Sequence, residues 1–111
     1  MIHILRQKAT QLQVDEMLQE LGTFIKLAVD IQRNILAGGG AMHADCESLL
    51  LQDGSIQADI WGADWMPSIQ KVEFDALINI RPNQQNFSMA IADQNIRQPV
   101  EAIARQFLEG V

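Results

Sequence analysis

The chain has little of several residue types, and each shortage excludes a class of protein. One cysteine among 111 residues excludes an internal disulfide and is typical of a reducing compartment. Lys and Arg number 8 against 14 Asp and Glu, and they form no basic cluster, so we expect no nucleic-acid partner. No apolar run approaches the roughly 18 residues of a membrane span, and the N-terminal apolar segment is too short for a signal peptide. We therefore expect a soluble, cytoplasmic protein that does not enter a membrane.

What is present is ordinary for a globular domain. Hydrophobic residues make up 48% of the chain and charged residues 20%, which argues against disorder. A chain of this length buries roughly two thirds of its unfolded surface, which is enough for one modest core. We therefore expect residues 1–111 to form a single compact domain.

The first third of the chain shows a strand, a helix and two further strands. Residues 2–5 predict a short strand, and a helix follows with Thr10 as its N-cap and Gly22 as its end. Apolar and polar residues alternate over 24–31, which predicts a strand. A short return strand over 35–37 follows a turn and is broken by the glycines.

The segment 42–52 is ambiguous between a strand and a helix. As a strand it places His43, Asp45 and Glu47 on one face, whereas a helix places His43 and Glu47 one turn apart. We favour the strand, because the Asp-Gly pair that follows is a hairpin-type turn signal and residues 56–61 can supply the partner strand.

The second half of the chain predicts one more strand and one more helix. Residues 71–80 alternate in polarity and Pro82 ends the strand. The last helix runs from about Pro99 to Glu109, and residues 93–98 form a separate turn. This order predicts an α+β fold: a mostly antiparallel sheet of four to five strands with two helices packed on one face.

Residues with chemical potential are concentrated between positions 38 and 65. This quarter of the chain holds three consecutive glycines, one of the two histidines, the only cysteine, five of the acids and both tryptophans. No Lys or Arg occurs between Arg33 and Lys71. The concentration predicts a functional site.

Several unusual strings follow one another along nearly the whole chain. They are Ala-Gly-Gly-Gly at 37–40, His-Ala-Asp-Cys-Glu at 43–47, Trp-Gly-Ala-Asp-Trp at 61–65, and Ala-Leu-Ile-Asn-Ile-Arg-Pro at 76–82 followed by Asn86, Ser88 and Met89. In this combination the chain resembles DUF5674, a family of small prokaryotic domains of unknown function. The resemblance implies a bacterial or archaeal origin and one compact domain. It implies no activity and no catalytic residue, because none is established for the family.

His43, Asp45 and Glu47 are the candidate catalytic residues. Asp45 or Glu47 can act as a base, and His43 as an acid or a ligand. Two of the three can share a metal ion, but their spacing matches no strong metal signature, so we assign no metal site and no cofactor. The simplest alternative is a solvated polar face.

Three further groups are candidate ligand-binding residues. Gly39 and Gly40 let the backbone approach a ligand or form a tight corner. Trp61 and Trp65 flank Asp64 and either line a pocket for a flat or cationic ligand or fill the core. Near the end of the last strand, Asn79 and Arg81 are the remaining candidates, with Arg81 clamping a carboxylate or phosphate or pairing with Asp45 or Asp64.

Cys46 is expected to be buried and inert, since nearby acids oppose formation of the thiolate. We expect His43, Asp45, Asp64 and Arg81 to share one cleft.

These candidates lead to two hypotheses about function. The first is a polar ligand-binding or hydrolase/transferase-like site for a small polar or anionic molecule, formed by residues 38–47, 61–65 and 79–81. The second is a non-catalytic interaction module, with the strand edge at 35–37 forming a homodimer.

Overall fold

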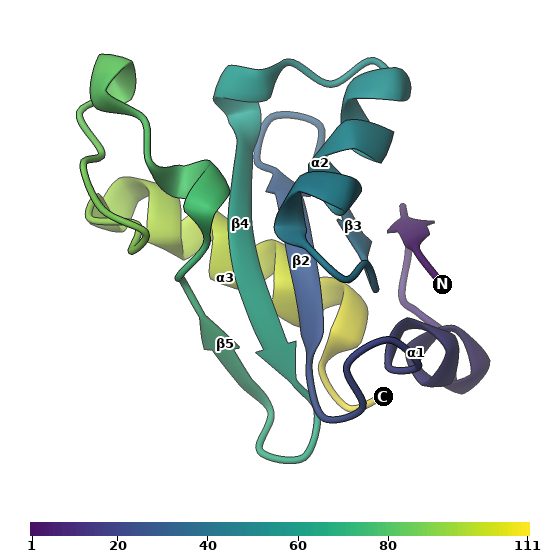
Figure 1. The fold of residues 1–111 in the computed structure, drawn as a ribbon. Coiled ribbons are helices and arrows are strands. Elements are labelled where there is room, and N and C mark those ends of the chain that lie inside the picture. Colours follow the sequence, from purple (N-terminus) through teal and green to yellow (C-terminus); the bar gives the residue numbers. More distant parts are fainter.

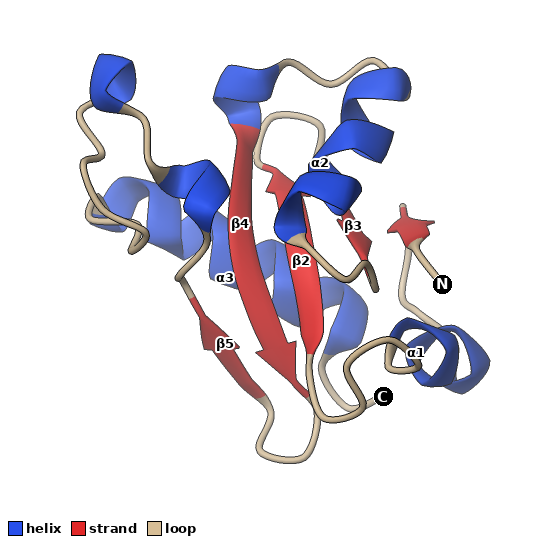
Figure 2. Ribbon diagram, viewed as in Figure 1, coloured by secondary structure: helices blue, strands red, loops and turns tan.

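The computed structural model describes residues 1–111 and contains one five-stranded antiparallel sheet and three α-helices (Figures 1 and 2). The strands lie in the order β1-β3-β2-β4-β5. Their bounds are β1 His3–Leu5, β2 Ile25–Asp30, β3 Ile35–Gly38, β4 Ile60–Met66 and β5 Lys71–Glu73. The α-helices are α1 Gln11–Met17, α2 His43–Gln52 and α3 Gln94–Leu108, and three short 3₁₀ helices span Gln57–Asp59, Leu77–Asn79 and Pro82–Gln84.

The alternation of side chains along β2 gives the sheet two buried faces. Ile25, Leu27 and Val29 point into a cluster of 17 buried residues to which α1 and α3 contribute. Ala28 points the other way, into a smaller cluster that includes Cys46 and Leu50 of α2. In Figure 1, α3 lies behind β2 and β4, and α2 lies in front of them.

The predicted α+β class and antiparallel sheet are confirmed, but the arrangement of helices differs from the prediction. The two predicted helices correspond to α1 and α3, and both contribute to the larger cluster. The unforeseen third helix, α2, covers the opposite face. The sheet is therefore covered on both faces.

The prediction of a strand over 42–52 is wrong, because this segment is α2. Its sequence after His43 is rich in Ala, Glu, Leu and Gln, which favour helix. At its start the Asp45 carboxylate accepts a hydrogen bond from the Met42 backbone N–H at 3.2 Å, which caps the helix. The Asp-Gly pair ends the helix instead of forming a hairpin: Gly54 has φ +102° and its N–H donates to the Leu51 carbonyl. The strand that follows therefore begins at Ile60 and not at residue 56.

The predicted strand over 71–80 is also too long. Strand β5 ends at Glu73, Asp75 forms only an isolated bridge with Ala90, and a 3₁₀ helix begins at Leu77. The cause is a set of side-chain hydrogen bonds from Asn79, described below, which periodicity does not reveal.

The last helix begins earlier than predicted. Asp93 is its N-cap and accepts a hydrogen bond from the Asn95 backbone N–H at 2.8 Å, so 93–98 is not a separate turn. Pro99 lies inside α3, where it lacks the N–H that would bond to the Asn95 carbonyl. Asn95 is exposed, so water can satisfy that carbonyl.

Most of the remaining predictions for the first third of the chain are confirmed, but α1 ends at Met17 and not at Gly22, because residues 18–21 form turns. Strands β1, β2 and β3 lie where expected, and Thr10 caps α1 by accepting from the Gln13 backbone N–H at 3.1 Å. The proposal that residues 35–37 form a sheet edge is wrong, because β3 lies between β1 and β2 and is buried. The edges of the sheet are β1 and β5.

Candidate functional site

A groove of about 410 Å³ lies on the side of the sheet that α2 covers. Its floor includes outward-facing residues of β2 and β4, the first turn of α2 forms one side, and residues 75–78 with Met89 form the other. Seven of the eleven lining residues are hydrophobic: Phe24, Met42, Ala44, Ala76, Leu77, Ile78 and Met89. The four polar lining residues are Lys26, His43, Asp64 and Asp75. Apolar walls with a few polar groups are typical of a small-molecule site.

The central polar feature of the groove is a hydrogen-bonded pair formed by His43 and Asp64. Nε2 of His43 lies 2.8 Å from Oδ1 of Asp64 and 3.1 Å from the Ala63 carbonyl oxygen. The side chains are 10% and 18% exposed, so the pair is largely shielded from water. His43 is the first residue of α2, and Asp64 lies on β4, so the packing of α2 on the sheet brings the two together.

Two more charged side chains line the same groove. Lys26 lies directly opposite Asp64 in the β2–β4 ladder, and its side chain therefore emerges on the same face of the sheet. Asp75 is held at the other side of the groove by its bridge with Ala90. The groove thus contains one cation, two carboxylates and one imidazole.

The wall formed by residues 75–78 lies close to the sheet because β4 has a glycine beneath it. A Cβ atom at Gly62 would lie 2.4 Å from Cβ of Ala76 and 2.9 Å from Cγ1 of Ile78. Any side chain at this position would push the wall outward. Gly62 is therefore required by close approach of two chain segments.

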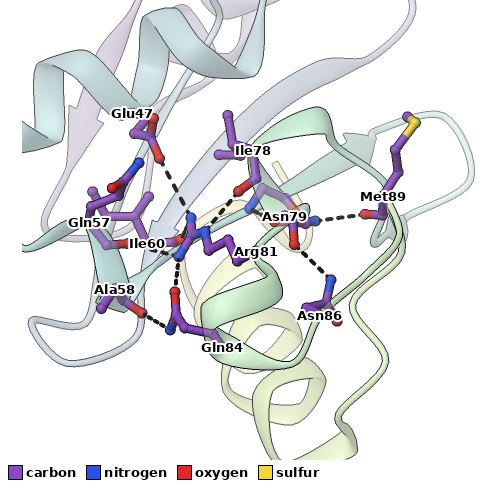
Figure 3. A network of polar contacts seen from close by, with 11 residues as sticks. Glu47, Gln57, Ala58, Ile60, Ile78, Asn79, Arg81, Gln84, Asn86 and Met89 are labelled. Atoms are coloured by element: carbon purple, nitrogen blue, oxygen red, sulfur yellow. Dashed lines mark hydrogen bonds and ion pairs between the residues drawn. The ribbon is translucent and has the colours of Figure 1, made fainter.

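The Asn79 side chain fixes the wall from behind. It is fully buried, and its amide exchanges two hydrogen bonds with the Gly62 backbone, at 2.7 and 3.0 Å. Its Nδ2 also lies 3.3 Å from the Phe74 carbonyl oxygen. The Met89 carbonyl oxygen lies 3.1 Å from the same Nδ2 (Figure 3). Asn79, one of the predicted ligand-binding residues, therefore supports both segments that form this side of the groove.

Asn86 extends the same network. It is 4% exposed, and its Nδ2 donates to the carbonyls of Asn79, Ser88 and Ala90. Its Oδ1 accepts from the Ala92 backbone N–H at 3.0 Å. The two asparagines thus hold the 74–92 segment in place with side-chain hydrogen bonds.

Arg81 does not act as a free anion clamp, because its N–H groups are already used within the protein. Nε donates to the Ile78 carbonyl at 2.8 Å and Nη1 to the Gln57 carbonyl at 2.9 Å. The remaining partners are the Gln84 side chain, the Ile60 carbonyl and, at 3.5 Å from Nη2, the Glu47 carboxylate (Figure 3).

Burial lowers the pKa of Arg81, and the charge of Glu47 opposes this effect. The guanidinium also lies 4.6 Å from the centre of the Trp61 ring. Through these contacts Arg81 connects three segments: the 3₁₀ helix that contains Ile78, the residues at the start of β4, and α2. It lines a second cavity with Glu47, of about 360 Å³, next to the groove.

The prediction that His43, Asp45, Asp64 and Arg81 share one cleft is therefore corrected. His43 and Asp64 share the groove, but Arg81 lies in the neighbouring cavity. Asp45 lines neither cavity and caps α2. The predicted alternative for Arg81 is an ion pair with Asp45 or Asp64. The carboxylate that Arg81 approaches is instead that of Glu47, one helical turn after His43.

The predicted glycine and tryptophan residues do not line the groove either. Gly39 has φ +107°, and a Cβ there would lie 2.2 Å from the Met1 carbonyl oxygen, so it forms a tight corner. Gly40 packs against Asp45 and Ile2. Trp61 and Trp65 are at most 1% exposed and belong to the core on the opposite face of the sheet.

Cys46 is buried, as predicted, although it lies on a helix and not on a strand. Its Sγ lies 3.5 Å from the Lys26 carbonyl oxygen, and burial raises the pKa of the thiol to about 11. A neutral buried thiol is a poor nucleophile.

Sequence reasoning missed Lys26, Asp75, Gly62 and the apolar walls as parts of the site. Lys26 had a usable signal, because it is the only base in a strand that is otherwise apolar up to Asp30. Asp75 and the walls had none, because residues 74–78 were assigned to a regular strand. No group of three or more His, Cys, Asp or Glu side chains is arranged to hold a metal ion. The structure also has no helix with the length and apolar character needed to cross a membrane.

The fold and groove define a small α+β domain with one largely apolar groove around a His–Asp pair. The family described as protein of unknown function, DUF5674, matches residues 3–107, so the chain belongs to this family, as its sequence motifs predicted. Neither a curated protein nor a solved structure matches the chain.

Proposed function

We propose that this domain binds a small, partly apolar molecule in the groove around His43 and Asp64. The observation that carries the proposal is the combination of seven hydrophobic lining residues with a shielded His–carboxylate pair. Apolar walls supply affinity through burial of ligand surface, and the few polar groups fix its orientation. A cytoplasmic location in a prokaryote remains part of this proposal.

Binding is a better-supported function than hydrolysis or group transfer. A His–Asp pair can act as a general base, but no Ser, Thr or Cys lines the groove to serve as a nucleophile. The single cysteine is buried beneath α2 and held as a neutral thiol. Arg81 and Glu47, which were predicted to bind an anion and to act as a base, contact each other in the neighbouring cavity.

The experiment is a fragment screen read by ¹H–¹⁵N correlation spectra of the wild-type protein. We expect hits to shift the amide resonances of Lys26, His43, Asp64 and Leu77. The residue Ala44 lines the groove and is exposed on α2, so Ala44→Trp should fill the groove and abolish binding.

Ser48→Trp is the matched control, because Ser48 is exposed on the same helix but does not line the groove. It should leave binding unchanged. Hits that map elsewhere, or that bind Ala44→Trp as well as the wild type, would refute the proposal.

A protein-interaction module is the second candidate, and one observation favours it. Residues 77–89, which include part of the groove wall, carry exposed apolar side chains. Phe87 is 73% exposed, and Leu77, Ile80 and Met89 are also exposed. If this surface forms a homodimer, sedimentation equilibrium should show a dimer that Phe87→Ser converts to a monomer. A wild-type monomer at high concentration would refute this candidate.

A further inference from the structure

We infer that the ligand of the groove carries an O–H or N–H donor and no negative charge, and that Nδ1 of His43 accepts this hydrogen. The inference rests on the proposed binding function and names the chemistry of the ligand. It follows from the partners of the imidazole, from its surroundings and from the balance of charge.

The partners of Nε2 fix the tautomer of the neutral ring. Asp64 Oδ1, at 2.8 Å, and the Ala63 carbonyl oxygen, at 3.1 Å, are both acceptors. Nε2 must therefore carry the hydrogen, since a bare nitrogen there would face two oxygen lone pairs. The neutral ring then has its lone pair on Nδ1.

No protein group donates to Nδ1, since every hydrogen bond of the His43 ring involves Nε2. The side chain is 10% exposed and lines a groove with mostly apolar walls. When a ligand fills the groove, its apolar parts displace the water that would otherwise donate to Nδ1. A donor on the ligand replaces that water, so ligands with a donor bind more tightly than ligands without one.

The charges in the groove disfavour an anionic ligand. Lys26 faces Asp64 across the ladder, and Asp75 lies on the other wall, so charges of both signs are present. A carboxylate ligand would meet the Nδ1 lone pair and two acids, and Lys26 offsets only one of those acids. A donor without negative charge avoids this repulsion.

Two probes with the same ring system test the inference: 2-naphthol, which has a donor, and 2-methoxynaphthalene, in which a methyl group replaces the hydrogen. At pH 8 we expect wild-type protein to bind 2-naphthol roughly tenfold more tightly than 2-methoxynaphthalene. His43→Phe should bind both compounds with similar affinity, because it keeps a ring but removes the acceptor.

The chain supplies its own control in the only other histidine. His3 also pairs through Nε2 with a carboxylate, that of Glu16 at 3.1 Å, but it does not line the groove. His3→Phe should therefore keep the preference for 2-naphthol. A preference that survives in His43→Phe, or that is lost in His3→Phe, would overturn the inference.

The failures are distinguishable. Equal binding of the two probes to wild-type protein overturns the inference and leaves the proposed function standing. Binding of neither probe overturns the inference, while the proposed function is decided by the fragment screen. If His43→Phe does not fold, long-range ¹H–¹⁵N spectra of the wild type decide: we expect the Nε2–H tautomer and an Nδ1 resonance that shifts with 2-naphthol alone. An Nδ1–H tautomer would overturn the inference.

Discussion

The side-chain amide of Asn79 pairs with the backbone of Gly62 as a neighbouring strand would. Gly62 donates its N–H to Oδ1 at 2.7 Å, and Nδ2 donates to the Gly62 carbonyl at 3.0 Å. Continued β4–β5 pairing would bring Asp75 opposite Gly62, but β5 ends at Glu73. Asn79 therefore satisfies the backbone of β4 where the strand pairing stops, and it frees residues 75–78 to form the groove wall.

Asn79→Ala should be strongly destabilising. It leaves the Gly62 N–H and several buried carbonyls without partners, and each unsatisfied buried group costs about 1–3 kcal/mol. We expect the free energy of unfolding to fall by at least about 3 kcal/mol in urea denaturation. Asn83→Ala, at an exposed position of the nearby 3₁₀ helix Pro82–Gln84, is the control and should change this free energy by less than about 0.5 kcal/mol. Equal effects of the two variants would contradict the role of Asn79.

Arg81→Lys should weaken folding more than ligand binding. Lysine keeps the charge but cannot reach the separate carbonyls of Gln57, Ile60 and Ile78 at once. We expect a loss of about 1–3 kcal/mol of stability, measured by urea denaturation, with groove hits still binding to the folded fraction. The comparison is Arg6→Lys, since Arg6 is exposed and pairs only with Asp53. A stable Arg81→Lys protein that binds no hits would return Arg81 to the role of ligand clamp.

Gly62→Ala should displace the groove wall. The new methyl group would overlap Cβ of Ala76 at 2.4 Å, which requires the wall to move and costs about 1–3 kcal/mol. Adding Ala76→Gly removes the closest of these contacts, so the double variant should recover part of the loss. Urea denaturation of the four proteins in this cycle gives the coupling energy. Strictly additive changes in the free energy of unfolding would show that the side chains at positions 62 and 76 do not clash.

The Cys46 thiol should resist alkylation in the folded protein. Cys46 is 0% exposed, and burial raises the pKa of its thiol to about 11. Only about one thiol in a thousand is therefore ionised at pH 8. Iodoacetamide labelling followed by mass spectrometry should be at least about a hundredfold slower than in urea-unfolded chain. Similar rates in the two states would reopen the question of a reactive cysteine.

The same thiol should make stability depend on alkaline pH. The folded state keeps the thiol neutral, whereas the unfolded chain ionises it near its ordinary pKa, so ionisation favours unfolding. The buried neutral thiol therefore contributes on the order of 2 kcal/mol to the free energy of unfolding. This contribution is fully present below about pH 8.5 and is lost as the pH rises to about 11. Cys46→Ala lacks this effect, so the stability difference between wild type and variant should narrow over that range. A constant difference would contradict it.

Local signals in the sequence predicted most of the sheet. The alternation around β2, the short strands β1 and β3, and the Thr10 cap depend on neighbouring residues, and all are confirmed. Segment 42–52 was assigned wrongly because its alternation of polar and small residues also fits a helix with Cys46 and Leu50 buried. The Asp-Gly pair that decided the choice serves a helix end as readily as a hairpin.

The site was predicted only in part, because its polar residues divide into two kinds that look alike in a sequence. His43 and Asp64 line the groove, as expected of a site. Asn79 and Arg81 are equally polar, but their hydrogen bonds go to backbone groups distant in the sequence. A buried amide or guanidinium binds a ligand only if its hydrogen bonds are not already made to the protein. Here the partners are carbonyls far away in the sequence, and a local sequence pattern does not predict such partners.

The burial of both tryptophans on the far side of the sheet determines what optical spectroscopy can report. The chain has no tyrosine, so its near-ultraviolet absorbance and emission come almost entirely from Trp61 and Trp65. Each indole lies beneath an arginine, Arg81 over Trp61 and Arg105 over Trp65. Emission will therefore follow loss of the core sensitively during unfolding, while a molecule seated in the groove will leave it almost unchanged. A compound can therefore bind in the groove without changing the tryptophan emission.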